Sequence, residues 1–294
     1  MNRQIITLIR PHQWLKNVFV FMPLFFDRHA TDWCYLKPCM LIFLAFCLVA
    51  SGIYCLNDIV DAPADRQHPV KCMRPVACGA VSKQTACVIM VIVWGAACII
   101  VVFGNFNGKQ VGLTGTVLFY IFMNVAYCLK LKQIAILDVF IIALGFVLRI
   151  VAGGLATGIT LSHWIVLTTF LLALFLAMAK RREDVTIYET SGTKTRKDVE
   201  RYNVVFLNLS IGMLGSITIM CYMLYTVSNE VVERIGSHYL YATSVFVLAG
   251  ILRYLQLTIV DQKTGSPTKV LLHDHFIHAC IIGWIVAFII ILYA

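Results

Sequence analysis

Charged residues are scarce in this chain of 294 residues. Asp, Glu, Lys and Arg make up 13% of it and hydrophobic residues 60%, with a mean hydropathy of +0.83. Water-soluble proteins contain about 25% charged and about 45–50% apolar residues. The composition therefore excludes a secreted disulfide scaffold, a disordered tail protein and a soluble nucleic-acid-binding protein, so no nucleic acid is expected as a partner. It indicates an integral membrane protein surrounded by membrane lipids.

Long runs without a charged residue give the membrane spans, because a bilayer core requires about 20 helical residues. The run 150–179 is too long for one crossing, and Gly153, Gly154 and Gly158 divide it. We therefore predict nine helices: a shorter segment ending at residue 26, then 38–57, 84–108, 110–129, 139–157, 161–179, 202–229, 235–252 and 276–294. The predicted fold is an all-α membrane protein with one polytopic domain over residues 1–294.

Acidic residues are also few, 15 against 24 Lys and Arg, and the net charge is +9. With the N-terminus in the cytoplasm, 18 Lys and Arg side chains fall in inner segments and four in outer ones. Basic residues concentrate on the cytoplasmic side of membrane proteins. We therefore predict that the N-terminus lies in the cytoplasm and the C-terminus outside. The long polar connections 59–83 and 180–201 then both face the cytoplasm, where we expect the reaction to occur.

The clearest motif closes the second predicted helix. Asn57 is followed by three carboxylates, Asp58, Asp61 and Asp65, at offsets of three and four residues. These offsets place them on one helical face, where they repel each other unless a cation neutralises them. Such hard oxygen ligands suit Mg²⁺, which completes its shell with water and substrate phosphates. Pro63 should end or kink the helix, so that Asp65 could come from the following turn.

The string NDIVDAPADR resembles the NDxxDxxxD signature of the UbiA superfamily of intramembrane prenyltransferases, a family with nine helices. Three further segments, RPHQWLKN, YCLKLKQIAILDVFIIALGFVLR and KRRED, resemble the branch that moves phosphoribose from phosphoribosyl diphosphate to a polyprenyl phosphate. The resemblance implies a UbiA-like bundle in the bacterial inner membrane, with a cytoplasm-facing active site. It also implies Mg²⁺ on Asp58, Asp61 and Asp65, with Asn57 beside them.

One departure from the family concerns its second aspartate-rich motif. At that place the chain has three cations, Lys180, Arg181 and Arg182. They could bind substrate phosphate directly, or they could be an ordinary positive anchor at a helix end. The sequence leaves these two interpretations equally open.

We predict further substrate contacts from three other regions. Arg149 lies eleven residues after Asp138, on the same helical face, and would bind an anion or pair with a site carboxylate. Lys130 is preferred over Lys132, which is interpreted as a topology charge. The full set of predicted contacts outside the basic run is Arg10, Gln13, Lys16, Asn17, Arg66, Lys71, Arg74, Tyr127, Lys130, Asp138 and Arg149.

These observations favour Mg²⁺-dependent transfer of 5-phosphoribose from phosphoribosyl diphosphate to a polyprenyl phosphate of the decaprenyl type, with release of diphosphate. The first alternative is prenyl transfer from a polyprenyl diphosphate to an aromatic or other acceptor, which predicts a second acidic motif. The second is a transporter of an anionic solute, which leaves the clustered carboxylates without a role. The lipid chain length and the oligomeric state, a homo-oligomer included, stay open.

Overall fold

The computed structural model describes residues 2–27, 29, 31–67, 71–106, 108–192, 199–261, 270 and 273–293, and these residues contain no β-strand. Within them, eight helices are long and apolar enough to cross a membrane. The protein is therefore an all-α integral membrane protein, as the composition predicts. Each of the eight overlaps one of the spans predicted from the sequence after residue 26.

The long helices follow one another along the chain. They are α3 (Trp33–Asp65), α4 (Lys83–Phe103), α5 (Gln110–Leu129), α6 (Leu137–Thr157), α7 (His163–Ser191), α8 (Val204–Val227), α10 (Ser244–Leu255) and α12 (His275–Tyr293). Short 3-10 turns and one short helix lie between them: η2 (Lys71–Met73), η3 (Leu131–Gln133), η4 (Val199–Arg201), α9 (Asn229–Ile235) and η5 (Tyr239–Thr243). A π-helical turn, η6 (Gln256–Val260), prolongs α10.

The N-terminal segment differs from the single helix that the sequence predicts. It consists of α1 (Asn2–Ile9), the 3-10 helix η1 (Pro11–Phe21) and α2 (Met22–Phe26). The break follows from Arg10, which adopts a left-handed backbone at φ 51° and ψ 63°, and from Pro11, which cannot donate a helical hydrogen bond. The predicted count of nine spans is thus not confirmed within the described residues.

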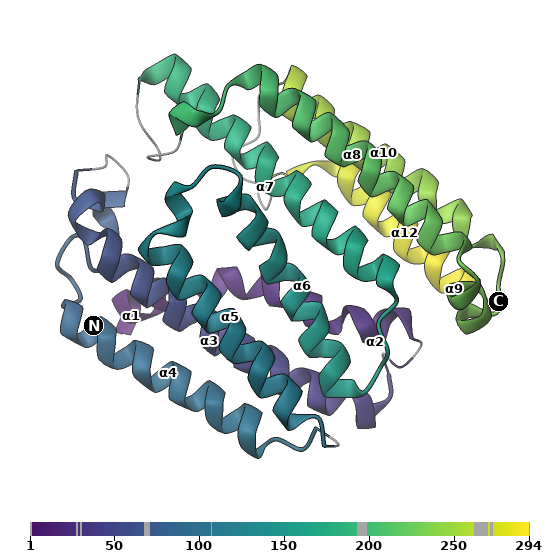
Figure 1. Ribbon diagram of the computed structural model, residues 1–294, viewed down its shortest axis with the longest axis horizontal. Helices are drawn as coiled ribbons and strands as arrows, with labels where there is room; N and C mark the ends of the chain where they lie inside the picture. Colours follow the sequence, from purple (N-terminus) through teal and green to yellow (C-terminus); the bar gives the residue numbers. More distant parts are fainter. Residues whose placement is uncertain are drawn as a thin grey trace. The chain divides into compact units, whose positions relative to one another are not determined.

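The chain divides into two compact units, and Figure 1 traces their helices by colour. The first unit comprises Met1–Lys132 and Leu148–Leu161, and in it α3 packs against α1, η1, α4 and α5. The second comprises Gln133–Val147 and Ser162–Ala294, and in it α7 packs on α8, and α10 on α8 and α12. The single domain expected over the whole chain stays a prediction.

The three glycines in and directly after the last turns of α6 have different structural roles. Gly158 has φ +77° and follows the last residue of the helix, which confirms the predicted end of this span. Gly153 and Gly154 lie inside α6 and do not break it, contrary to the prediction. A Cβ atom on Gly153 would overlap the carbonyl oxygen of Val20 in η1. The missing side chain therefore permits α6 and η1 to approach closely.

We expect Gly153→Ala to lower the midpoint of thermal unfolding in detergent, because overpacking against backbone costs about 1–3 kcal/mol. Gly95→Ala in α4 is the matched control, since a Cβ atom there meets nothing within 4 Å. The control should be neutral or stabilising by up to about 1 kcal/mol, because alanine has the higher helix propensity. Equal midpoints for the two variants would contradict the close packing of α6 on η1.

Candidate active site

The acidic motif occupies the last two turns of α3. The helix continues through Pro63 and ends at Asp65, so the predicted end at Pro63 is wrong and Asp65 belongs to the helix, while the alternative of a kink at Pro63 stays a prediction. Arg66, directly after the helix, still donates its backbone N–H to the carbonyl of Ala62, at 3.2 Å. Proline removes one helical hydrogen bond, and near a helix end the loss is small. All three carboxylates are therefore presented by one regular helix.

A small apolar core beside this helix end brings distant chain segments to the motif. Its buried members come from α1, α3, the loop after α3 and α4, and are Leu8, Cys55, Ala62, Val76, Val81 and Ala86. Leu8 precedes Arg10 by two residues, and Val76 follows Arg74 by two. Ser82 accepts a hydrogen bond from the backbone N–H of Thr85 and caps α4. Apolar burial thus positions two basic side chains next to the carboxylates.

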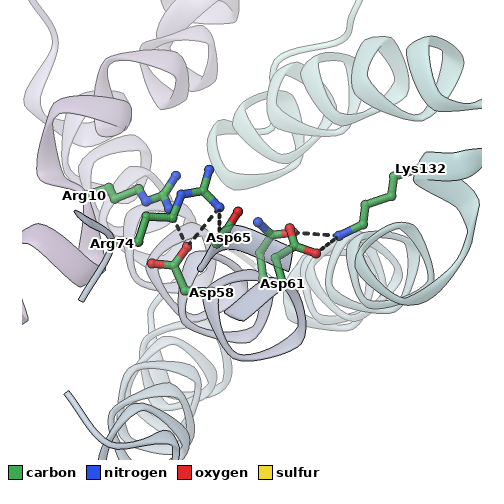
Figure 2. Close-up of polar contacts among 7 residues, drawn as sticks. Arg10, Asp58, Asp61, Asp65, Arg74 and Lys132 are labelled. Atoms are coloured by element: carbon green, nitrogen blue, oxygen red, sulfur yellow. Dashed lines mark hydrogen bonds and ion pairs between the residues drawn. The ribbon is translucent and has the colours of Figure 1, made fainter. Parts of the chain in front are cut away.

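Asp58 and Asp65 share one arginine (Figure 2). Arg74 Nη1 lies 2.7 Å from Asp65 Oδ2 and 3.7 Å from Asp58 Oδ1. Arg10 Nη2 lies 2.5 Å from the same Asp58 Oδ1. The Asp58 side chain is 1% exposed, so its charge depends on these guanidinium groups for compensation.

The third carboxylate has a separate partner. Lys132 Nζ lies 2.5 Å from Asp61 Oδ1 and donates a second hydrogen bond to Asn57 Oδ1, at 3.3 Å. Asp61 is the most accessible of the three, with 27% of its side chain exposed. Lys132 was interpreted from the sequence as a topology charge, and that interpretation missed this contact. Helical spacing relates residues within one helix and cannot relate η3 to α3. Only the basic character of the loop could have indicated the contact of Lys132 with the motif.

The donor set fits Mg²⁺, although no group of three His, Cys, Asp or Glu side chains within the described ranges surrounds one metal position. Mg²⁺ needs only one or two protein carboxylates when substrate phosphates supply further oxygens. Asp58 Oδ2 is buried and accepts no hydrogen bond. An unpartnered buried carboxylate oxygen is costly, and a bound cation would satisfy it.

Arg149 is buried in the first unit among neutral polar and aromatic groups. Its Nε donates to Asn17 Oδ1 and its Nη2 to the hydroxyl of Tyr120, both at 2.7 Å. The guanidinium also lies over the rings of Tyr120 and Phe46, at 4.9 and 5.8 Å from their centroids. The Asn17 contact links two residues that were predicted separately. The predicted roles of Arg149, binding an anion or pairing with a site carboxylate, stay predictions.

The remaining predicted residues of the first unit differ in their exposure and their contacts. Arg66 donates to the carbonyl of Ala77, at 3.1 Å, whereas Arg74 pairs with Asp65. Lys130 is exposed at the end of α5. The others are partly buried: Gln13 and Lys16 on η1, Lys71 at the start of η2, and Tyr127 on α5.

A buried network in the second unit contains Asp138 and Arg181. Arg181 Nε lies 2.7 Å from Asp138 Oδ2, and its Nη1 lies 2.6 Å from Asp184 Oδ2. Tyr202 donates its hydroxyl to Asp138 Oδ1, at 3.3 Å, and accepts the backbone N–H of Ile136. Ile136 has φ +71°, a conformation that a β-branched residue adopts only when its surroundings hold it. The network stabilises this turn before α6.

The three cations of the basic run differ in their surroundings. Lys180 is partly buried, whereas Arg181 and Arg182 are 2% and 4% exposed. Arg182 Nε donates to Asn208 Oδ1, at 2.7 Å, which joins α7 to α8. The sequence left phosphate binding and anchoring equally open. In the structure, two of the three cations make intramolecular contacts inside the second unit.

A comparison with known families agrees with the all-helical membrane fold. A family model described as the UbiA prenyltransferase family matches residues 19–281. The chain belongs to this family. It is an enzyme of the UbiA superfamily embedded in the membrane, so the transporter alternative is set aside.

Two relatives and one solved structure illustrate the likeness to UbiA proteins. The chain is 32% identical to a decaprenyl-phosphate phosphoribosyltransferase of Mycolicibacterium smegmatis, over 96% of this chain and 90% of the relative. It is 31% identical to one of Corynebacterium glutamicum, over 98% of this chain and 86% of the relative. A UbiA homolog from Archaeoglobus fulgidus bound to GPP and Mg²⁺ has the same fold, with a TM-score of 0.71, 19% identity, and coverage of 99% of this chain and 100% of that one.

We expect Arg181→Gln to destabilise the protein strongly, because it leaves Asp138 buried without its cation, at a cost of about 3–5 kcal/mol. The matched control is Lys180→Gln, one residue earlier on a partly buried side chain. Thermal unfolding of both purified variants in detergent gives the comparison. A stable Arg181→Gln protein that only loses affinity for phosphoribosyl diphosphate would make Arg181 a substrate ligand instead.

Proposed function

We propose that this enzyme transfers 5-phosphoribose from phosphoribosyl diphosphate to a polyprenyl phosphate, with Mg²⁺ as its cofactor, and releases diphosphate. The observation that carries the proposal is the identity of about 30% over nearly the whole chain to two enzymes named decaprenyl-phosphate phosphoribosyltransferase. The charge-balanced acidic motif supports it, because carboxylates and cations together suit substrates that carry several phosphates.

In this proposal, the carboxylates of Asp58, Asp61 and Asp65 are the candidate metal ligands, and one or two of them would hold the ion, which would neutralise the leaving diphosphate. Asn57 lies beside Asp61 and shares Lys132 with it. Arg74 and Lys132 each pair with a motif carboxylate in the structure, so they would be available to bind phosphate groups of a substrate held at this motif. Lys71, three residues before Arg74, would extend this basic wall.

The reaction would be a displacement at the anomeric carbon of the ribose. The bond from that carbon to the diphosphate oxygen breaks, a bond to an oxygen of the lipid phosphate forms, and diphosphate departs with the electron pair. The lipid phosphate is already ionised, so no strong general base is required. Catalysis then comes from positioning and from charge stabilisation in a site of low water content.

We further propose that the protein resides in the bacterial inner membrane with its N-terminus and active site in the cytoplasm and its C-terminus outside. The excess of Lys and Arg in the segments assigned to the inside supports this orientation. Phosphoribosyl diphosphate is water-soluble, whereas a polyprenyl phosphate is a membrane lipid. A site at the membrane boundary gives both substrates access.

The central experiment incubates the purified protein in detergent with Mg²⁺, labelled phosphoribosyl diphosphate and a polyprenyl phosphate. We expect label to enter the lipid phase, EDTA to abolish transfer, and Asp61→Asn to lower turnover by about 100-fold or more, the loss typical for one electrostatic group of an active site. Glu230→Gln is the control, since this carboxylate is exposed and pairs with Arg234 on α9. Consumption of a polyprenyl diphosphate with an aromatic acceptor, without phosphoribosyl transfer, would contradict the proposal and favour prenyl transfer.

Two neighbouring lysines allow a second test. We expect Lys132→Gln to raise the KM for phosphoribosyl diphosphate by about 10-fold, the loss of one charge-assisted contact. Lys130→Gln should raise this KM less, because Lys130 is exposed at the end of α5. Steady-state kinetics with saturating polyprenyl phosphate distinguish the two. A larger effect from Lys130 would restore the role that the sequence favoured for it.

A further inference from the structure

The two oxygens of Asp58 have different surroundings. Oδ1 is approached by Arg10 Nη2 at 2.5 Å and by Arg74 Nη1 at 3.7 Å. Oδ2 is buried and accepts no hydrogen bond. Figure 2 shows both guanidinium groups on the same oxygen. The carboxylate is therefore held from one side, and its other oxygen is left for a further ligand.

Of the two arginines, Arg10 makes the shorter contact with Asp58 Oδ1. Arg74 lies nearer to Asp65, at 2.7 Å, than to Asp58. Arg10 pairs with Asp58. The orientation of Asp58 consequently depends mainly on Arg10.

Two features of the first unit hold Arg10 in place. Its guanidinium lies over the ring of Tyr54, with Cζ 5.0 Å from the ring centroid, and Tyr54 is one helical turn before Asp58 on α3. Its backbone has φ 51° directly before Pro11, although residues before proline favour extended conformations. A strained backbone of this kind persists only where its surroundings determine it, and such residues concentrate at functional sites.

We infer that Arg10 and Tyr54 are positioning residues that fix Asp58 through Oδ1 and so keep Oδ2 available to the divalent cation. The inference rests on the proposed function for the identity of that cation. It replaces the direct substrate contact that the sequence predicts for Arg10. Tyr54 was not selected from the sequence, although its offset of four residues from Asp58 places it on the same helical face.

The test compares Tyr54→Leu with Tyr54→Phe in the full-length protein in detergent, without substrate. Mn²⁺ replaces Mg²⁺, and the loss of the free Mn²⁺ signal in electron paramagnetic resonance measures binding. Phenylalanine keeps the ring face beneath the guanidinium and leucine does not, while neither variant changes a charge. We expect Tyr54→Leu to raise the Kd for Mn²⁺ about 3- to 10-fold and Tyr54→Phe to stay near wild type, because the ring face carries the cation–π attraction.

Arg10→Gln separates positioning from phosphate binding. Removal of a positive charge beside a cation site would tighten Mn²⁺ binding by Coulomb's law alone, whereas loss of orientation weakens it. We expect weaker binding. Unchanged or tighter binding in both Arg10→Gln and Tyr54→Leu, with a raised KM for phosphoribosyl diphosphate, would make Arg10 a phosphate ligand and overturn the inference.

Two controls keep the result interpretable. Asp58→Asn is the reference variant for loss of Mn²⁺ binding. Equal Mn²⁺ affinity of this variant and the wild type would also overturn the inference. Arg10→Lys, which keeps the charge, replaces Arg10→Gln if size-exclusion chromatography shows that the latter does not fold. Because no substrate is present, the expected Mn²⁺ pattern without phosphoribosyl transfer would refute the proposed reaction and support the positioning role.

Discussion

The architecture of the first unit depends on how three carboxylates at the end of one membrane helix are neutralised. Asp58, Asp61 and Asp65 lie within eight residues, and Asp58 is almost wholly buried. An ionised carboxylate without a partner is strongly destabilising in such a place. Arg10, Arg74 and Lys132 supply an equal number of positive charges. The helix end is therefore stable only because three other chain segments return to it.

Each of these segments is fixed by something other than its charge. Arg10 sits at the junction of α1 and η1, where Leu8 enters the apolar core, and Arg74 is followed by Val76 in the same core. Lys132 lies in the short turn η3 between α5 and α6. Apolar burial thus determines where the backbone runs, and the long basic side chains then reach the carboxylates. A substrate with several phosphates could compete for these cations without any rearrangement of the backbone.

Periodic and local features of this protein could be predicted from sequence. Eight spans, the acidic motif, the cap at Ser82 and the helix end at Gly158 follow from hydrophobic runs, helical spacing and single-residue conformational preference. Features that depend on convergence of distant segments could not. The sequence preferred Lys130 to Lys132, because spacing along one chain does not tell which side chain reaches α3. It also gave no sign that Arg10 has a left-handed backbone, since this conformation is imposed by tertiary contacts.

Nearby acidic side chains offset the positive charge of the basic run 180–182 of α7. Lys180, Arg181 and Arg182 are three cations, but Glu183 and Asp184 follow them on the same helix, and Asp138 binds Arg181 from α6. Three positive and three negative side chains give no net charge. For Arg181 to bind a substrate phosphate it would have to leave two carboxylates, one of them fully buried. In the second unit, Arg181 therefore belongs to an internal ion network with Asp138 and Asp184, and Arg182 joins α7 to α8 through Asn208.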